Sequence, residues 1–243
     1  MGVVVPREKK PPLLVRVLFL LKRFRIGSPR QRLKLFLDLE WTFRRFSEEE
    51  SVDVLHGLDH PYIGNTRRFV LPKVRSDFTV LDVGCANGSF SVFLAENAAH
   101  VIGIDISPED ISLCNNLTSN RRVEFEVADV HVYLKNTSYR FDVIFLCHIL
   151  EHLDDPLKLL ISARTNCRYL YVEVPDFDRC TTNEYRKMIG TELVYSDDDH
   201  RFEFDREELI ELLDQSGFLI EDHEYRNGVM RFWCSAHSET AAS

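Results

Sequence analysis

The segment from Val80 to Gly88 combines residue types that suit a nucleotide-like ligand. It reads VLDVGCANG: an apolar run ends at the carboxylate of Asp82 and passes into a loop of small residues. A second apolar run, VIGID, ends at Asp105. A tight turn lets the backbone approach a ligand, and a carboxylate on the neighbouring strand accepts hydrogen bonds from a ribose. The loop is one residue tighter than G-x-G-x-x-G and carries Ala86 at its middle glycine, which argues against a dinucleotide.

A second polar group follows a later apolar run. The sequence CHILEH, Cys147 to His152, comes directly after the run FDVIFL. In a parallel sheet this group lies at the same edge as Asp82 and Asp105. His148 and His152 can both be neutral near pH 7, so both are candidate general bases. For His152 the alternative is a structural role, tying the loop to the sheet.

Apolar runs that alternate with helix-forming segments predict the elements that position these residues. The alternation is typical of a parallel sheet with helices on both faces. The expected strands cover 78–83, 100–105, 123–127, 141–147 and 169–174, and the expected helices cover 65–73, 89–97, 108–119 and 156–165. A capping box at Asp205 and Glu208 predicts a further helix ending at Gly217. Asn227-Gly228 then predicts a hairpin between strands at 218–226 and 229–234.

Over roughly residues 75–234 the chain resembles the class I S-adenosylmethionine (SAM) dependent methyltransferases. The family loop E/D-x-G-x-G-x-G corresponds to Asp82–Gly88, with Ala86 in place of a glycine, and the terminal hairpin resembles the family's last two strands. The resemblance implies an α/β fold. We expect a Rossmann-like, seven-stranded, mostly parallel sheet with an antiparallel last strand, helices on both faces and an N-terminal helical extension. The extension is expected over 1–45 and the methyltransferase domain over 46–243, with its core at 76–235.

The resemblance also implies SAM as the cofactor and assigns roles around it. Asp105 would accept hydrogen bonds from the ribose hydroxyl groups, Asp129 would take the adenine amino group, and Asp82 would help to hold the methionine ammonium group. An ordinary helix cap is the alternative role for Asp129. The expected cofactor-binding residues are Asp82, Gly84, Cys85, Ala86, Gly88, Asp105, Ile106, Asp129, Val130 and Cys147.

The element Leu150-Glu151-His152 resembles that of many small-molecule methyltransferases. Ubiquinone-pathway O-methyltransferases and small-RNA 2′-O-methyltransferases carry Glu-x-x-Glu-His here and use it for a divalent metal. This chain has His148 at the first position, which favours a metal-free site; a metal held by His148, Glu151, His152 and His200 is the alternative. The long stretch 175–204 predicts a lid over the acceptor. The expected acceptor contacts are Tyr62, Asp176, Tyr185 and His200.

Charge is distributed unevenly along the 243 residues. The net charge is −9, yet residues 1–45 hold twelve Lys or Arg against three acids. The remainder is strongly acidic, which makes a nucleic-acid partner unlikely. The six cysteines form no C-x-x-C pair, which indicates reduced thiols in a cytosol-like compartment. We therefore expect a cytoplasmic protein; the sequence does not indicate its oligomeric state.

The N-terminal segment has its own pattern. Leu13 to Leu21 is apolar but interrupted by Arg16, too short to span a bilayer, and lacks a signal-peptide cleavage site. Basic residues flank it, so residues 7–25 fit a basic amphipathic helix in peripheral contact with an anionic membrane. A helix packed on the domain or a partly disordered tail are the alternatives. The helix expected over Arg32–Phe46 has a broad apolar face, which we expect to be buried against the body or a second subunit.

Together these features favour transfer of a methyl group to a small-molecule or lipid- or glycan-linked acceptor, with an oxygen nucleophile. RNA 2′-O-methylation is a second hypothesis. A catalytically degenerate SAM-binding module is a third, and it rests on Ala86 and the altered first ligand.

Overall fold

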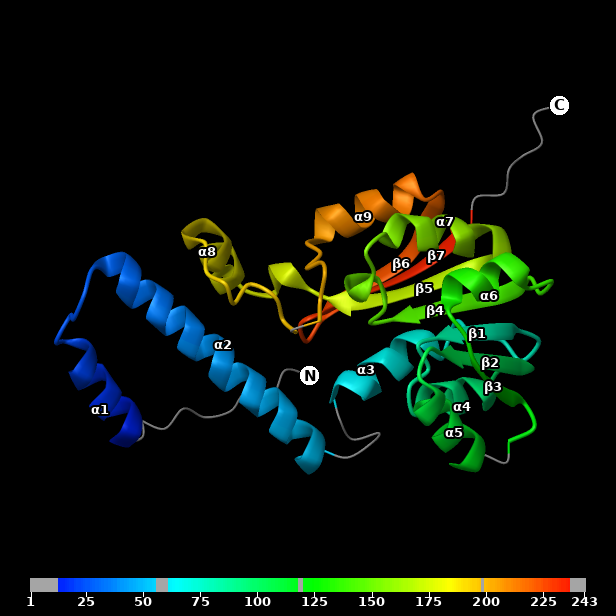
Figure 1. The fold of residues 1–243 in the computed structure, drawn as a ribbon, viewed down its shortest axis with the longest axis horizontal. Helices are drawn as coiled ribbons and strands as arrows, with labels where there is room; N and C mark the ends of the chain where they lie inside the picture. The colour runs from blue at the N-terminus through cyan, green and yellow to red at the C-terminus, as the bar shows by residue number, and fades with distance from the viewer. Residues whose placement is uncertain (1–12, 56–60, 118–119, 198, 237–243) are drawn as a thin grey trace.

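A computed structural model describes residues 13–55, 61–117, 120–197 and 199–236. Its centre is one seven-stranded sheet with the order β3-β2-β1-β4-β5-β7-β6 (Figure 1). Strand β7 runs antiparallel to both of its neighbours, and the other neighbouring pairs are parallel. The expected mixed sheet is confirmed. The strands are β1 (Thr79–Val83), β2 (His100–Asp105), β3 (Val123–Val127), β4 (Phe141–Cys147), β5 (Cys167–Pro175), β6 (Phe218–Arg226) and β7 (Val229–Ala236).

The hairpin between β6 and β7 turns at the two residues that the sequence indicates. Asn227 has φ 53° and Gly228 has φ 77°. Positive φ at both central residues is what a two-residue turn between twisted strands requires, and Asn-Gly adopts it at little cost. The turn brings β7 back between β6 and β5.

Helices cover both faces of the sheet and divide the interior into two cores. Because successive side chains of a strand point to opposite faces, Val80 enters one core and its neighbour Leu81 enters the other. The Leu81 core lies under α6 (Val130–Asn136), α7 (Pro156–Asn166) and α9 (Arg206–Gln215). The Val80 core lies under α3 (Pro61–Val70), α4 (Ser89–Ala95) and α5 (Pro108–Leu117).

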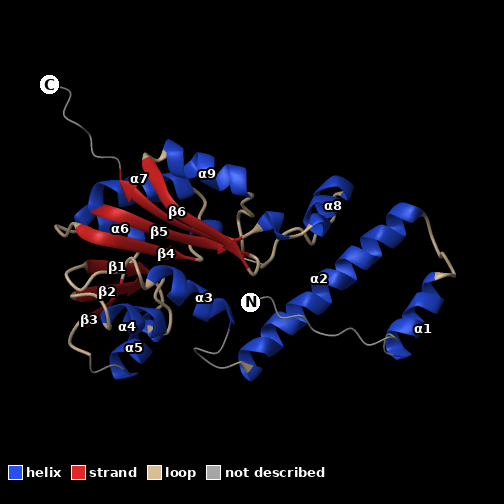
Figure 2. Cartoon of the chain, turned by 180° about the vertical axis from the view of Figure 1, so that it is seen from behind, coloured by secondary structure: helices blue, strands red, loops and turns tan. Residues whose placement is uncertain are grey.

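Two N-terminal helices form an arm that extends away from the sheet (Figure 2). They are α1 (Leu13–Lys22) and α2 (Pro29–Val54). A capping box starts α2, because the side chains of Ser28 and Gln31 satisfy each other's backbone N–H groups. The boundary expected between residues 45 and 46 falls inside α2. Ion pairs one turn apart, including Arg45–Glu49 at 2.8 Å, favour continuation of the helix past that point.

The arm is attached to the body through α8 (Thr181–Ile189), a helix within the stretch expected as a lid. Arg186 of α8 is buried, donates a 2.9 Å hydrogen bond to the Leu37 carbonyl and forms an ion pair with Glu40. Further along α2, the Trp41 indole donates a 2.8 Å hydrogen bond to the Tyr195 carbonyl. One side of α2 therefore faces the body.

The other side of α2 is exposed, so the expected burial of its broad apolar face against the body is wrong, and the alternative, burial against a second subunit, stays a prediction. Leu37 is the buried apolar residue of this stretch. The apolar side chains that remain exposed are Leu33, Leu35, Phe36, Leu39, Phe43 and Phe46. Among the described residues, the body contacts the side of α2 that carries Leu37 and Trp41 and leaves the opposite side uncovered. Within the described ranges, no helix combines the length and apolarity needed to cross a membrane.

Candidate active site

The loop after β1 is shaped by residues with positive φ. Gly84 (φ 68°) and Gly88 (φ 74°) lie in the left-handed region, where a side chain is strained. A Cβ on Gly88 would also lie 2.7 Å from the Phe125 ring and 2.8 Å from the Cys114 sulfur. Ala86 adopts φ 44° with a side chain present. The family glycine that Ala86 replaces therefore corresponds to a position that requires positive φ here as well.

Asp105 is held against this loop by two backbone donors. Its carboxylate accepts hydrogen bonds from the Ala86 N–H at 3.0 Å and the Ser107 N–H at 2.9 Å. A carboxylate has about four acceptor positions, so capacity for two ribose hydroxyl groups remains. The next residue, Ile106, is 75% exposed, so an apolar surface lies open beside the carboxylate. The structure brings Gly84, Ala86, Asp105 and Ile106 together as the sequence predicts.

Asp82 lies beneath the loop and is almost completely buried. Burial raises its pKa to about 7; the hydrogen bond from the Ser91 hydroxyl (2.5 Å) opposes this shift and the charge of Asp105 adds to it. Burial likewise raises the pKa of the Cys85 and Cys147 thiols, so both stay protonated near neutral pH. Neither cysteine is therefore available as a thiolate nucleophile.

Asp129 takes the capping role that the sequence left as its alternative. Its side chain accepts a 3.0 Å hydrogen bond from the Val132 N–H and caps α6, which begins at Val130. This position lies past the end of β3, next to β2 in the sheet, so it stays at the same edge as Asp105. A cap here does not conflict with an adenine contact, because capping uses one of the two carboxylate oxygens.

His148, directly after β4, is held between two buried carboxylates. Its Nδ1 lies 2.9 Å from Oε1 of Glu151 and its Nε2 lies 3.4 Å from Oε1 of Glu173. The backbone N–H of His148 donates a 2.8 Å hydrogen bond to the backbone carbonyl of Glu173, and the φ of His148 is 54°. Burial lowers the pKa of His148, but the hydrogen bond and charge of Glu151, with the charge of Glu173, outweigh it and raise the pKa above 6.5. The site thus fixes the imidazole and tunes its proton affinity.

Glu173 is part of a buried network that the sequence analysis did not identify. It forms a 2.9 Å ion pair with Arg231 of β7, which is fully buried, and it accepts hydrogen bonds from Thr66 and Tyr171. The signal was present in the sequence: Glu173 interrupts an otherwise apolar strand, YLYVEVP. A lone charge in a buried strand requires a partner of opposite charge.

A hollow of about 550 Å³ opens in front of His148. Its polar wall includes His148 and His200, its apolar wall includes Pro175 and Val229, and α2 closes one side with Arg45, Glu48, Ser51 and Leu55. The hollow and the glycine loop are linked through adjacent residues: His148 lines the hollow, and a Cβ on Gly84 would lie 2.2 Å from Cδ1 of Ile149, the next residue. A donor on the loop and an acceptor in the hollow would therefore be neighbours.

His152 lies behind this hollow, in a cluster with Glu151 and His200. One ligand atom from each of these three residues lies within 4.8 Å of the others. His152 Nδ1 lies 3.3 Å from Asp199, and the His152 ring packs edge-on against the His200 ring. Among the described residues, Oε2 of Glu151 is buried with no hydrogen-bond partner. This orphaned oxygen beside two imidazoles fits a divalent cation, with two histidines and one carboxylate as ligands.

Three of the expected acceptor contacts need correction or fall outside the description. Asp176 is buried, and its carboxylate receives two hydrogen bonds from Arg206, at 2.7 and 3.2 Å, so it is a structural ion pair. Tyr185 lies on α8, half exposed, and is not among the residues that line the hollow. The side chain of Tyr62 lies outside the described residues. Of the three expected contacts whose side chains are described, His200 lines the hollow and the other two do not.

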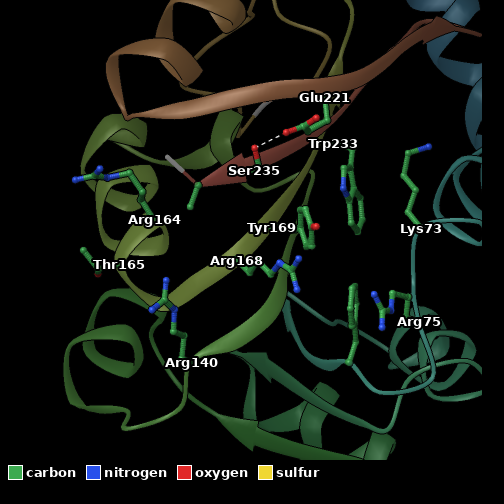
Figure 3. Close-up of a pocket in the computed structure, with 12 residues that line it drawn as sticks. Lys73, Arg75, Arg140, Arg164, Thr165, Arg168, Tyr169, Glu221, Trp233 and Ser235 are labelled. Carbon is green, nitrogen blue, oxygen red and sulfur yellow. Dashed lines mark hydrogen bonds between the residues drawn. The ribbon is translucent and has the colours of Figure 1, made fainter. Parts of the chain in front are cut away.

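A larger hollow, of about 1010 Å³, lies at the opposite edge of the sheet (Figure 3). Arg140, Arg164 and Arg168 line one part of it, and Lys73 and Arg75 line another. It opens at the amino ends of β4 and β5, whereas the glycine loop and His148 follow the carboxyl ends of their strands. Size alone would thus point to the wrong edge for methyl transfer.

Comparison with known proteins agrees with this geometry. A family model described as a methyltransferase domain matches residues 54–223. The ubiquinone biosynthesis O-methyltransferase of Coxiella burnetii (strain Dugway 5J108-111) is 34% identical over 124 residues, which cover 48% of this chain and 51% of the relative. That of Hahella chejuensis is 32% identical over 98 residues, 40% of each chain. The match thus spans about half the length of the first of these curated relatives and 40% of the length of the second.

Solved structures share the fold at low sequence identity. A SAM-dependent methyltransferase from Archaeoglobus fulgidus aligns with a TM-score of 0.57 and 17% identity, over 78% of this chain and 99% of that chain. Magnesium protoporphyrin IX methyltransferase from Synechocystis PCC 6803, solved with bound SAH, aligns with a TM-score of 0.56 and 16% identity, over 72% and 81%. The family match covers most of the chain and the fold agrees with it: the chain belongs to the methyltransferase domain family and has the fold of SAM-dependent methyltransferases.

Proposed function

We propose that this protein transfers the methyl group of SAM to an oxygen atom of a small or lipid-linked acceptor. The observation that carries the proposal is the position of His148, beside the glycine loop and facing a separate hollow. The loop and Asp105 would hold the donor, and the hollow would hold the acceptor. Asp82 below the loop would assist with the ammonium group of the methionine moiety.

The chemistry divides between the donor and the protein. Methyl transfer is an in-line displacement in which the sulfonium supplies the leaving group, so the protein contributes alignment and removal of the acceptor proton. A neutral His148 whose Nδ1 is bonded to Glu151 would accept that proton at Nε2, which requires the ring to turn Nε2 from Glu173 toward the hollow. The resulting imidazolium would be stabilised by the charges of Glu151 and Glu173. His152, which faces Asp199 and His200, would support the loop rather than act as the base.

The acceptor class follows from the hollow and from the relatives. A volume of about 550 Å³ suits a small molecule or the head group of a lipid. The relatives named as ubiquinone biosynthesis O-methyltransferases support an oxygen nucleophile and a lipid-linked acceptor. A sugar hydroxyl or phenol is consistent with a base of raised pKa, because each loses its proton as the methyl group arrives.

A divalent cation is a second candidate for activating the acceptor. The orphaned Oε2 of Glu151 beside His152 and His200 favours it. Those three residues would hold the ion, which would lower the pKa of a bound hydroxyl group. Against it, the other oxygen of Glu151 already forms a 2.9 Å hydrogen bond with Nδ1 of His148, so the buried carboxylate has a polar partner without a metal. We therefore retain the metal-free base as the leading mechanism.

The acceptor class can be read from the destination of the methyl group. We expect protein incubated with methyl-labelled SAM and a cell extract to place label in the organic-solvent fraction. An oxygen-methyl ether survives mild alkali, whereas a methyl ester releases methanol. Label in the RNA fraction would instead support 2′-O-methylation, and the variant Asp105→Asn, deprived of the ribose acceptor, serves as the matched blank.

The base should appear in the pH dependence of the rate. Because the pKa of His148 is raised, the wild-type rate should increase with pH through a pKa above 6.5, as the imidazole becomes neutral. His148→Gln should lower kcat at least about a hundredfold and abolish this rise. His100→Gln, at the opposite edge of the sheet, is the control. A His148→Gln enzyme that keeps both the rate and the rise would exclude His148 as the base.

Removal of metal separates the two mechanisms. We expect enzyme treated with EDTA and desalted to keep its full rate, and metal analysis by mass spectrometry to find no stoichiometric ion. A rate that is lost on chelation and restored by Zn²⁺, together with metal content lost in Glu151→Gln, would make the cation the activating group and would contradict the metal-free mechanism.

A further inference from the structure

The exposed side of α2 carries a continuous apolar stripe. Phe36, Leu39, Phe43 and Phe46 are spaced by three, four and three residues, which places them on one face of a helix. Their exposures are 43%, 41%, 63% and 55%. The opposite face carries Leu37, which is buried, and Trp41 and Arg45, which contact the body. The stripe therefore faces away from the domain that the helix serves.

Helix α1 extends the same apolar surface. Leu13, Val17 and Leu20 recur at helical spacing and are exposed, as are Leu18 and Phe19. An isolated helix of this length is marginal in water. Lys22 at its end lies over the Phe36 ring, 5.8 Å from the centroid, and connects α1 to the start of the stripe. We refer to α1 and the stripe together as the apolar arm.

The charges around the first part of the apolar arm, α1 and the start of α2, have one sign. Between residues 13 and 36 there are seven cationic side chains and no acid: Arg16, Lys22, Arg23, Arg25, Arg30, Arg32 and Lys34. The chain as a whole has a net charge of −9, so this concentration of positive charge is local. At this end the exposed apolar surface is bordered by cations, which matches the interface of a membrane that contains anionic lipids. Farther along α2, the acids Asp38 and Glu40 form ion pairs with Lys34, Arg44 and Arg186.

We propose that the apolar arm docks on an anionic lipid surface. The apolar side chains would enter the boundary between head groups and acyl chains, and the cations would lie among the lipid phosphates. The body-facing side of the same helix lines the hollow in front of His148, through Arg45, Glu48 and Leu55. Docking would thus hold the acceptor hollow close to the membrane. This placement would help the enzyme to reach a lipid-linked acceptor, and that benefit rests on the proposed function. The docking itself does not depend on it.

Co-sedimentation of the full chain with vesicles tests the proposal. Wild-type protein should sediment with phosphatidylcholine vesicles that contain phosphatidylserine, and more weakly with phosphatidylcholine alone. Phe43→Ser with Phe46→Ser should weaken partitioning at least about tenfold, because two aromatic side chains no longer leave water. Arg16→Gln with Arg23→Gln should weaken it about tenfold on anionic vesicles only. Ile161→Ser with Leu219→Ser, a matched exposed pair on the body, should leave it unchanged.

Three results would overturn the proposal. The first is wild-type protein that does not sediment with anionic vesicles. The second is equal sedimentation of the wild type and the Phe43, Phe46 variant. The third is a concentration-dependent dimer in light scattering that this variant abolishes without any vesicle binding, which would assign the arm to a second copy. SAM binding should be measured on each preparation. Because the apolar arm contributes no residue to the glycine loop, loss of vesicle binding with SAM binding retained would concern the docking proposal and not the proposed function.

Discussion

The buried ion pair between Glu173 and Arg231 is the interaction on which the candidate site depends. Both side chains are at most 1% exposed, and they lie opposite each other on the antiparallel pair β5 and β7. Removing one partner of such a pair leaves an uncompensated buried charge, at a cost of about 3–5 kcal/mol. Oε1 of Glu173 also lies 3.4 Å from Nε2 of His148, which follows the end of the neighbouring strand β4. Strand β7, whose antiparallel direction makes the sheet mixed, therefore also supplies Arg231, the positive charge that balances Glu173 beside His148.

The site separates two tasks between two kinds of structure. The donor side is built from backbone: left-handed loop residues and strand ends that place Asp105 against Ala86. The acceptor side is built from side chains contributed by β4, the stretch before α9, and α2. A loop shaped by backbone tolerates little change in sequence, whereas a wall of side chains can differ between relatives. This explains why the donor is easier to infer than the acceptor.

The sequence predicted the regular part of the fold well, because the central strands β1, β2 and β4 are mostly apolar and several element boundaries have local chemistry. The capping box at Asp205 and the turn at Asn227 are examples. It failed where tertiary contacts decide. It also overlooked one local signal: helix α3 begins at Pro61 rather than Asn65, since a proline suits the first helical turn. Helix α8 was missed because its ordering depends on the contact of Arg186 with α2.

The site could be predicted to the same extent and for the same reason. Residues in the loop motif and at strand ends, such as Asp82, Asp105 and His148, occupy the expected positions. Asp176 was expected at the acceptor because it lies in the long stretch expected as a lid, but Arg206, thirty residues later, donates hydrogen bonds to its carboxylate. Glu173 and Arg231 were missed because only the pairing of β5 with β7 shows that they neutralise each other.

The central claim, that the loop after β1 and Asp105 form a SAM site, is tested most directly by calorimetric titration of SAM into the purified protein. We predict a single site for the wild type. Asp105→Asn should weaken binding at least about tenfold, through loss of charged hydrogen bonds to the ribose, and Asp214→Asn, an exposed acid on α9, should have no effect. Absence of SAM binding by the folded wild type, or equal affinity in Asp105→Asn, would contradict the account.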